Sequence, residues 1–290
     1  MRFADAHGIS AVDLQHLTVL GWPAVESQEV GGWTVRFSSG ITRRANSVVS
    51  TEMPADVGAL DAAVDEVERR SAERWLSPTF QLWQPASGSW LEGRAAGEIP
   101  DAETDAFYEG QQRLGDLLDR RGYQEVAPTK VLWMDRSDVP SDTEWDRRIL
   151  VSETLSENWL SASLRSGDAE DVEDQASRLV RRRLLGGGRS RFYSCLDAEG
   201  QIGGGAKLSL VTPEGSGRTY AGIYALWVRD DLRGQGLSAS LLDAIFNHLV
   251  RLDVSGCWLQ VEERSARALG VYRAAGFSTV AQYRYLTHLD

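Results

Sequence analysis

The chain has 290 residues, of which 42% are hydrophobic, 25% charged and 9% aromatic, a composition typical of a globular protein large enough for two domains. A formal net charge of -11 argues against nucleic acid as a partner, and no apolar run reaches the roughly 18 residues that a membrane span needs. The N-terminal residues lack the pattern of a signal peptide. We therefore expect a cytoplasmic protein that binds neither nucleic acid nor membrane.

The cysteine content excludes two further kinds of site. Cys195 and Cys257 are the only cysteines, and no Cys or Cys/His spacing matches a zinc site. We therefore expect neither a disulfide framework nor a bound metal.

Acidic charge is concentrated in the first half. Residues 1–140 hold 22 acidic and 13 basic side chains, whereas residues 141–290 hold 20 and 18. The first half therefore favours a cationic partner such as an amine, with a solvated acidic surface as the simpler alternative. The second half suits an anionic ligand.

In the first half, the patterning predicts helices and strands in alternation. Ser10 can cap a helix that reaches Leu20, and the alternation over Trp33–Phe37, followed by a turn and Val48–Val49, predicts a β-hairpin. The remaining expected elements are a helix over 57–67, a strand over 79–83, a loop over 84–105, a helix over 107–118 and a strand over 130–134.

A short polar segment, Asp135–Asp146, contains Pro140 and reads as a linker between residues 1–140 and 141–290. The elements expected beyond it are helices around Trp159 and Leu179, a hairpin over 192–211, a strand over 220–228, a helix over 237–250, a strand over 257–261, a helix over 264–275 and a strand over 278–286.

Two segments repeat the same local pattern 154 residues apart. Gly122-Tyr123 and Gly276-Phe277 each follow an expected helix and precede an expected strand. The repeat indicates a diverged duplication, and a chance likeness between common α/β elements is the alternative.

The most informative run, Trp227–Ser238, places a strand end, a Gly-rich loop and a helix start in succession. Gly234 and Gly236 let the backbone approach a ligand closely, and the unpaired amides of a helix start attract anions. The run matches neither the P-loop nor the Rossmann glycine spacing. It therefore predicts an anion site of another kind, or a helix start that binds nothing.

These residues resemble a known family. Arg233-x-x-Gly236-x-Ser238 is similar to the acyl-CoA signature [QR]-x-x-G-x-[GA] of the GNAT superfamily of N-acyltransferases. The strand Leu259–Val261, then Ala268, Tyr272 and Gly276-Phe277, resemble that superfamily's second signature in its order and spacing.

The resemblance implies a fold in two parts. Residues 141–290 are expected to be a catalytic GNAT domain of the α/β (α+β) class, with a mixed, mostly antiparallel sheet flanked by helices. Residues 1–140 are expected to be a smaller, degenerate GNAT-like domain without cofactor motifs, as in tandem GNAT proteins, with a role in substrate recognition or structure.

The resemblance also implies acetyl-CoA as co-substrate and a set of residues that hold it: Leu226, Trp227, Val228, Arg233, Gly234, Gln235, Gly236, Leu237, Ser238, Ser265 and Tyr272. Two of them depart from the family pattern. Ser238 replaces a Gly or Ala, and Ser265 replaces an Asn, so its hydroxyl can supply only part of that amide's hydrogen bonding.

The implied reaction is N-acetyl transfer to the primary amine of a small molecule, by direct attack in a ternary complex. Tyr272 stands at the position of the family's general acid, although a buried aromatic core residue is the simpler reading. The strand over 220–228 contains no acid, so Glu262, beside Glu263, is the candidate general base. A water chain or an acid from the first half are the alternatives.

Two other functions remain open. A non-catalytic acyl-CoA-binding or sensing protein is favoured by the missing strand acid and by Ser265. A protein acetyltransferase, acting on lysine or N-terminal amines, would need an open peptide groove. The sequence also leaves open the amine, the acyl chain length and whether the chain forms a homodimer.

Overall fold

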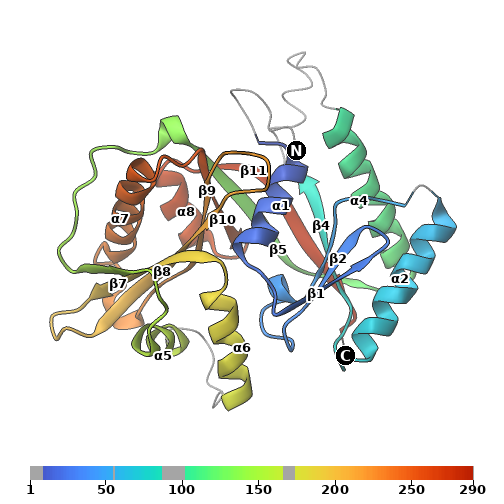
Figure 1. Ribbon diagram of the computed structural model, residues 1–290, viewed down its shortest axis with the longest axis horizontal. Coiled ribbons are helices and arrows are strands. Elements are labelled where there is room, and N and C mark those ends of the chain that lie inside the picture. The colour runs from blue at the N-terminus through green and yellow to red at the C-terminus, as the bar shows by residue number, and fades with distance from the viewer. Residues whose placement is uncertain (1–8, 55, 87–101, 166–173, 290) are drawn as a thin grey trace.

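The computed structural model describes residues 9–54, 56–86, 102–165 and 174–289, and shows two α/β lobes that share one continuous sheet (Figure 1). The helices in these ranges are α1 (Ala11–Gly21), α2 (Val57–Ala72), α4 (Ala102–Arg120), α5 (Glu157–Arg165), α6 (Gln175–Gly186), α7 (Leu237–Arg251) and α8 (Ala266–Ala274), with short 3-10 turns η1 (Arg43–Ala45), η2 (Arg136–Asp138) and η3 (Asp230–Leu232).

The sheet has eleven strands in the order β1-β2-β3-β4-β11-β5-β10-β9-β8-β7-β6. They are β1 (Glu26–Val30), β2 (Trp33–Phe37), β3 (Val48–Ser50), β4 (Thr79–Pro85), β5 (Gln124–Asp135), β6 (Ile149–Ser152), β7 (Arg189–Leu196), β8 (Ile202–Val211), β9 (Tyr220–Val228), β10 (Gly256–Glu262) and β11 (Ser278–Thr287). The pairs β3–β4 and β9–β10 are parallel and the other eight are antiparallel. The predicted fold class, with its mixed and mostly antiparallel sheet, is confirmed.

The two halves of the chain exchange their last strands. β5, the last strand of the first half, pairs with β10 of the second half, and β11, the last strand of the chain, pairs with β4 of the first half. β5 and β11 also pair with each other at the centre of the sheet. Each lobe is therefore completed by a strand from the other half.

The pairing of β5 with β11 is symmetric about the centres of the two strands. With the offset of 154, Gln124 corresponds to Ser278 and Trp133 to Thr287. In the sheet Ser278 lies opposite Trp133 and Thr287 opposite Gln124, so the start of each strand faces the end of the other. A twofold axis between two copies of one strand requires this arrangement, which supports the duplication.

Each of the two central strands is interrupted by an irregularity. The register shifts beside Val280 in β11 and beside Ala127 and Pro128 in β5, where Ala127 has a φ of 49°. Proline lacks an amide hydrogen and is tolerated in a central strand where a bulge breaks the ladder. The carbonyl oxygen of Pro128 accepts a hydrogen bond of 2.8 Å from the amide of Glu263, which follows β10.

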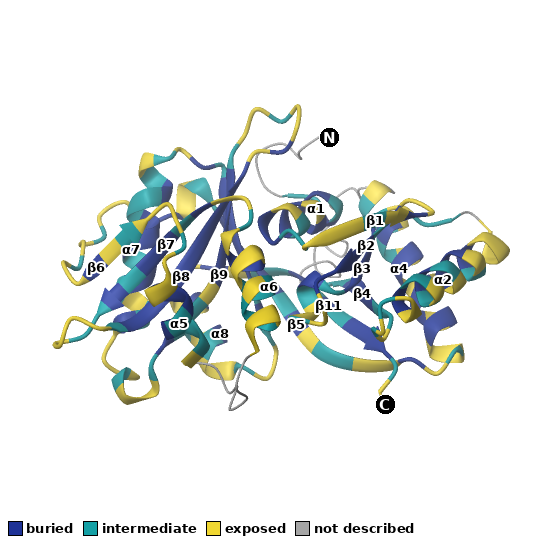
Figure 2. Ribbon diagram, turned by 60° about the horizontal axis from the view of Figure 1, so that its bottom comes forward, coloured by how far each residue is buried: buried dark blue, intermediate teal, exposed yellow. Residues whose placement is uncertain are grey.

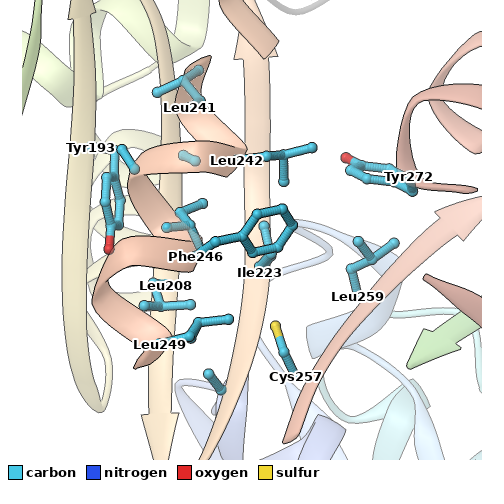
Figure 3. Packing of buried hydrophobic residues seen from close by; sticks show 14 of the residues in the cluster. Tyr193, Leu208, Ile223, Leu241, Leu242, Phe246, Leu249, Cys257, Leu259 and Tyr272 are labelled. Carbon is cyan, nitrogen blue, oxygen red and sulfur yellow. The ribbon is translucent and has the colours of Figure 1, made fainter. Parts of the chain in front are cut away.

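The core forms layers on both faces of the sheet. Leu241 and Leu249 from α7 are fully buried against β8 and β9 (Figure 3). Ile245 of the same helix is fully buried as well. A second apolar cluster joins α1, α5 and α6 to the sheet and contains Trp159 and Trp258. In the other lobe a third cluster joins α2 and α4 to β2, β3 and β4. The buried residues accordingly follow the sheet through both lobes (Figure 2).

Helix α1 belongs to the first half of the chain but contacts β8 and β9 of the second half. The contact depends on Gly21, because a Cβ there would lie 2.6 Å from the Tyr224 hydroxyl oxygen and 2.7 Å from Cζ2 of Trp258. Glycine therefore permits the end of α1 to approach the sheet at this point, where the chain enters the space between the lobes.

Most expected elements are present, with differences at their ends. The side chain of Ser10 caps α1 as predicted, and Gly122 and Gly276 have positive φ values of 82° and 99°. The short strands β1 and β6 were not predicted, because edge strands of four or five residues show little apolar alternation. Helix α7 stops at Arg251, one residue beyond the expected end, and β10 begins at Gly256, one residue before the expected start. Most of the loop expected over 84–105 lies outside the described residues.

Within the described ranges, no helix combines the length and hydrophobicity needed to cross a membrane. The same ranges contain no group of three or more His, Cys, Asp or Glu side chains placed to hold a metal ion. Both cysteines are buried and unpaired.

The strand exchange predicts that the halves stay together when the chain is cut. A protease site inserted between the exposed residues Ser141 and Asp142 should yield two fragments that co-elute at the size of the intact protein, because β5 lies between β10 and β11. Native and denaturing size-exclusion chromatography of cut and uncut protein would measure this. Two folded fragments that separate without denaturant would contradict the expectation.

Candidate functional site

Strand β9 contains a bulge near its carboxyl end. Gly205 of β8 pairs with Trp227 of β9, and Lys207 of β8 pairs with Tyr224 of β9. The step between these pairs is two residues in β8 and three in β9, so β9 contains one extra residue here. Ala225 lies within the bulge and has a φ of 46°. A bulge bends its strand and changes the direction of the side chains that follow it.

Just before the bulge, β9 stops pairing with its other neighbour, β10. The parallel ladder between them ends at the pair Ile223 and Leu259, although β9 continues to Val228 and β10 to Glu262. Main-chain groups on the facing edges of two such strands are no longer used by the sheet and can bind a ligand.

Helix α7 begins directly beside this opening. Gly236 is its N-cap, with a φ of 80°, and Gly234 has a φ of 81°. The amide of Ser240 is the first in the helix to donate an intrahelical hydrogen bond, which reaches the carbonyl oxygen of Gly236 at 3.1 Å. The amides that precede Ser240 therefore have no intrahelical acceptor. A Cβ on either glycine would meet nothing within 4 Å, so the space over the loop is open for an anionic group.

These elements enclose a cavity of about 670 Å³, which we call the loop cavity. It is lined by Leu226, Trp227, Val228, Leu232, Arg233, Gly234, Gly236, Leu237, Ser238, Ala239, Ser265, Arg267, Ala268, Val271 and Tyr272. The structure thus brings together every residue that the sequence assigned to acetyl-CoA except Gln235. The Gln235 side chain is exposed and reaches back to the Asp231 carbonyl oxygen at 3.5 Å.

Tyr272 projects from α8 into the space beside α7 (Figure 3). Its ring is 9% exposed and packs edge to face against Phe277, with 6.3 Å between the ring centroids. Burial raises the pKa of Tyr272 to about 12. The phenol therefore keeps its proton at neutral pH and can act as a donor within the loop cavity.

Two polar side chains of the cavity are only partly used within the protein. Arg233 is half exposed and forms an ion pair of 2.6 Å with Asp230. Ser265 is the N-cap of α8, yet its hydroxyl makes no capping hydrogen bond. Both groups can therefore turn toward a ligand at small cost.

The candidate base Glu262 does not line the loop cavity. Its carboxylate forms an ion pair of 2.6 Å with Arg264, and that of Glu263 pairs with Lys130 at 3.1 Å. The structure therefore gives no geometric support to Glu262 as the base.

A second cavity of about 280 Å³, the interlobe cavity, lies between the two halves of the chain. It is lined by Trp22, Ile41, Thr42, Ser163, Leu164, Arg181, Leu184, Leu185, Ala225, Leu226 and Trp227. Leu226 and Trp227 also line the loop cavity, so the two cavities meet at the β9 bulge. Gly205 makes room for the Trp227 indole, since a Cβ there would lie 3.1 Å from two of its ring atoms.

Sequence reasoning did not find the interlobe cavity. Its walls come from the residues after α1, the loop before η1, helices α5 and α6, and the β9 bulge. These segments are far apart in the sequence, so no short motif contains them. The unusual backbone of Thr42, with a φ of 59°, is likewise invisible in the sequence.

A buried lysine lies beside the interlobe cavity. Lys207 is fully buried, with its Nζ 4.9 Å from the centroid of the Trp22 ring and 3.4 Å from the Leu184 carbonyl oxygen. No carboxylate among the described residues pairs with it, and desolvation lowers its pKa to about 7.

The comparisons with known proteins agree with this geometry. Residues 153–277 match the model of the acetyltransferase (GNAT) family, and residues 10–94 match that described as "Probable histone acetyltransferase Rv0428c C-terminal". A curated mycothiol acetyltransferase of Propionibacterium freudenreichii subsp. shermanii is 38% identical over 65 residues, which is 22% of this chain and 21% of that protein. The chain thus matches about a fifth of that relative's length.

Solved structures resemble the whole chain. A GCN5-related N-acetyltransferase from Kribbella flavida has a TM-score of 0.63 at 14% identity, covering 98% of this chain and 97% of that one. A tandem GNAT protein from the clavulanic acid biosynthesis pathway has a TM-score of 0.60 at 12% identity, covering 95% and 87%. At these identities the likeness concerns the fold.

The chain as a whole has the fold of these GNAT structures, the tandem GNAT protein included. Within this fold, the match to the acetyltransferase (GNAT) family lies in residues 153–277, and the second family match lies in the N-terminal half.

The charge of Arg233 provides a test of the loop cavity. Arg233→Glu should weaken CoA binding by about ten- to a hundredfold, because it places an anion beside the helix start that would hold the pyrophosphate. Calorimetric titration with CoA would measure this. Arg251→Glu, the same reversal at the far end of α7, is the matched control, and equal affinities of both variants would refute the role of the loop.

The burial of Lys207 predicts a pH dependence of stability. Its pKa is about 7 in the folded protein, whereas an ordinary lysine titrates near 10.4, so the unfolded chain binds more protons between these values. The contribution of Lys207 to the free energy of unfolding therefore rises with pH across this window. We expect Lys207→Met to flatten the profile and to stabilise the protein at pH 7 by roughly 1 to 4 kcal/mol.

Urea unfolding between pH 6 and 10 would measure the effect of Lys207→Met. The control is Lys130→Met, which removes the other lysine, an ion-paired one. Parallel profiles for the parent and the Lys207 variant would show that the buried amine is not linked to folding.

Proposed function

We propose that the protein transfers the acetyl group of acetyl-CoA to the primary amine of a small molecule, by direct attack in a ternary complex. One observation carries the proposal: a single cavity joins the β9 opening, the amides at the start of α7 and the phenol of Tyr272. These are the three parts that the reaction needs, namely an oriented donor arm, an anion site and a proton donor.

The residues present fit acetyl-CoA, which supplies an activated acyl group as a thioester when bound. The amides at the start of α7 and the Arg233 guanidinium would hold its pyrophosphate. The main chain of Leu226–Val228, which β10 no longer pairs, would orient the pantetheine arm and offer an N–H to the thioester oxygen. Ser265 also lines the loop cavity.

Tyr272 is proposed as the general acid. Its raised pKa keeps the proton on Oη at neutral pH, and the position of the ring in the loop cavity suits delivery to a departing sulfur. A thiolate that receives this proton leaves as a neutral thiol. Glu262 is not retained as the base, because its carboxylate pairs with Arg264 and Glu262 does not line the loop cavity.

The two halves of the chain are proposed to have different roles. Residues 141–290 supply the loop cavity and the catalytic residues, and residues 1–140 supply one wall of the interlobe cavity through Trp22, Ile41 and Thr42. The degenerate first half would thus serve substrate recognition. Since acetyl-CoA for such reactions is drawn from the cytoplasm, we place the activity there.

Removal of the Tyr272 hydroxyl tests the proposal. Tyr272→Phe should lower kcat by about 10² to 10⁴ while the affinity for CoA stays unchanged, because the proton donor is lost and the anion site is intact. Thiol release from acetyl-CoA, followed with a panel of amines, would measure the rate.

The control for Tyr272→Phe is Tyr193→Phe. Tyr193 is buried in the same apolar cluster on the other side of α7, where its hydroxyl bonds to His248 at 2.6 Å (Figure 3). Unchanged turnover in Tyr272→Phe would overturn its role as the acid. Tight CoA binding by the parent protein with no amine-dependent thiol release would instead indicate an acyl-CoA sensor.

A further inference from the structure

The two halves of the chain have the same arrangement around their parallel strands. Counted outward from the central β5–β11 pair, β4 and then β3 lie on one side, and β10 and then β9 lie on the other. The pairs β3–β4 and β9–β10 are the parallel ones, and a helix follows the outer strand of each, α2 in the first half and α7 in the second. The place that corresponds to the loop cavity is therefore the end of β3, beside the start of α2.

The strands β3 and β4 stop pairing before β4 ends, as β9 and β10 do in the second half. The ladder between β3 and β4 ends at the pair Val49 and Gln81, although β4 continues to Pro85. In the second half, the residues of β9 beyond the last pair include Leu226–Val228, which line the loop cavity. In the first half, main-chain groups beyond the last pair bind a side chain of the protein itself.

Gln111, on α4, forms hydrogen bonds to both strands beyond their last pair. Its Oε1 accepts a hydrogen bond of 3.1 Å from the amide of Trp83 in β4, and its Nε2 donates one of 2.7 Å to the carbonyl oxygen of Ser50 in β3. The same nitrogen lies 3.2 Å from the Ser50 hydroxyl oxygen. Gln111 is 2% exposed, so its amide satisfies main-chain groups that water does not reach.

The position of Gln111 corresponds to a residue of the loop cavity. Gln111 precedes Gly122 by eleven residues, and Ser265 precedes Gly276 by the same number. Ser265 lines the loop cavity. A primary amide supplies an acceptor and donors, which are also the groups that the amides in the pantetheine arm of CoA supply. Gln111 therefore offers β3 and β4 the hydrogen bonding of a pantetheine amide.

The loop after β3 packs closely on α4. A Cβ on Gly110 of α4 would overlap Cγ of Met53, which lies in the loop between β3 and α2. Glycine at this position therefore permits the loop to close on the helix. In the second half, the corresponding loop and α8 both line the loop cavity.

The start of α2 is capped by a carboxylate of the chain. Asp56 accepts a hydrogen bond of 2.8 Å from the amide of Ala59, whereas Gly236, the N-cap of α7, has no side chain that could do so. Residues 51–56 contain two acidic side chains, Glu52 and Asp56, and no basic one. Negative charge here satisfies the helix start and repels a diphosphate.

We propose that the first half contains a second copy of the acyl-CoA site, which the chain fills with its own side chains. Gln111 takes the place of a pantetheine amide and Asp56 takes the place of the pyrophosphate. These residues hold β3, β4 and α4 together, and the protein binds one acyl-CoA per chain, in the loop cavity. The count of one rests on the proposed function, which assigns acetyl-CoA to that cavity, whereas the filling of the first half does not.

Removal of the Gln111 amide tests the filling. Gln111→Met keeps the length of the side chain and leaves the Trp83 amide and the Ser50 carbonyl oxygen without a partner. It should therefore lower the midpoint of urea unfolding by about 1 M. Gln111→Asn, whose shorter amide reaches only one strand, should lose about half as much. The control is Gln112→Met, at the exposed neighbour on the same helix, which should leave the midpoint unchanged.

CoA titration of the full-length protein tests the count. Calorimetry should give one CoA per chain for the parent, with the same number and affinity for Asp56→Ser and Gln111→Asn, because neither residue meets the cofactor. Asp56→Ser removes the carboxylate but keeps an oxygen that can cap α2. A second binding event in the parent, or a CoA affinity that falls about tenfold or more in either variant, would place CoA in the first half and overturn the proposal.

The results separate this inference from the proposed function. Equal urea midpoints for Gln111→Met and Gln112→Met, with one CoA bound per chain, would overturn the filled copy and leave the proposed reaction standing. A lower midpoint for Gln111→Met, with no CoA bound by the parent protein, would leave the filled copy standing and overturn the proposed reaction.

Discussion

The antiparallel pairing of β5 with β11 holds the two lobes together, because each of these strands completes the sheet of the other half. β5 lies between β11 and β10, and β11 lies between β4 and β5. The lobes are therefore joined by main-chain hydrogen bonds, which are directional and set the distance between neighbouring strands. This fixes the position of Trp22 and Thr42 relative to β9, and with it the shape of the interlobe cavity.

The β9 bulge is the point at which the two cavities meet. β9 stops pairing with β10 just before the bulge, and the residues after Ala225, Leu226 and Trp227, lie in the walls of both cavities. On one side, the amides of α7 present partial positive charge to the loop cavity. On the other, Arg181 lies in the lining of the interlobe cavity. The acidic residues that dominate the net charge contribute to neither lining.

Much of the loop cavity could be predicted from the sequence because its chemistry is local. Arg233, Gly236 and Ser238 lie within six residues, and the positive φ of Gly236 follows from a helix start that only glycine accommodates easily. Tyr272 was recognisable from its spacing to Gly276. Glu262 could not be assessed in this way, because its ion pair with Arg264 depends on where β10 ends and how the chain turns there.

Local sequence patterns specified the alternation of helices and strands, the two glycine-ended repeats and the motifs that resemble acyl-CoA signatures, since each depends on neighbours along the chain. Three features follow from long-range packing alone: β5 and β11 change places, α1 packs on the opposite lobe, and Trp22, Thr42 and Arg181 line one cavity. The physical reason is that strand partners and cavity walls are selected by packing between residues far apart in the chain. A local pattern specifies which face is apolar, but not which partner covers it.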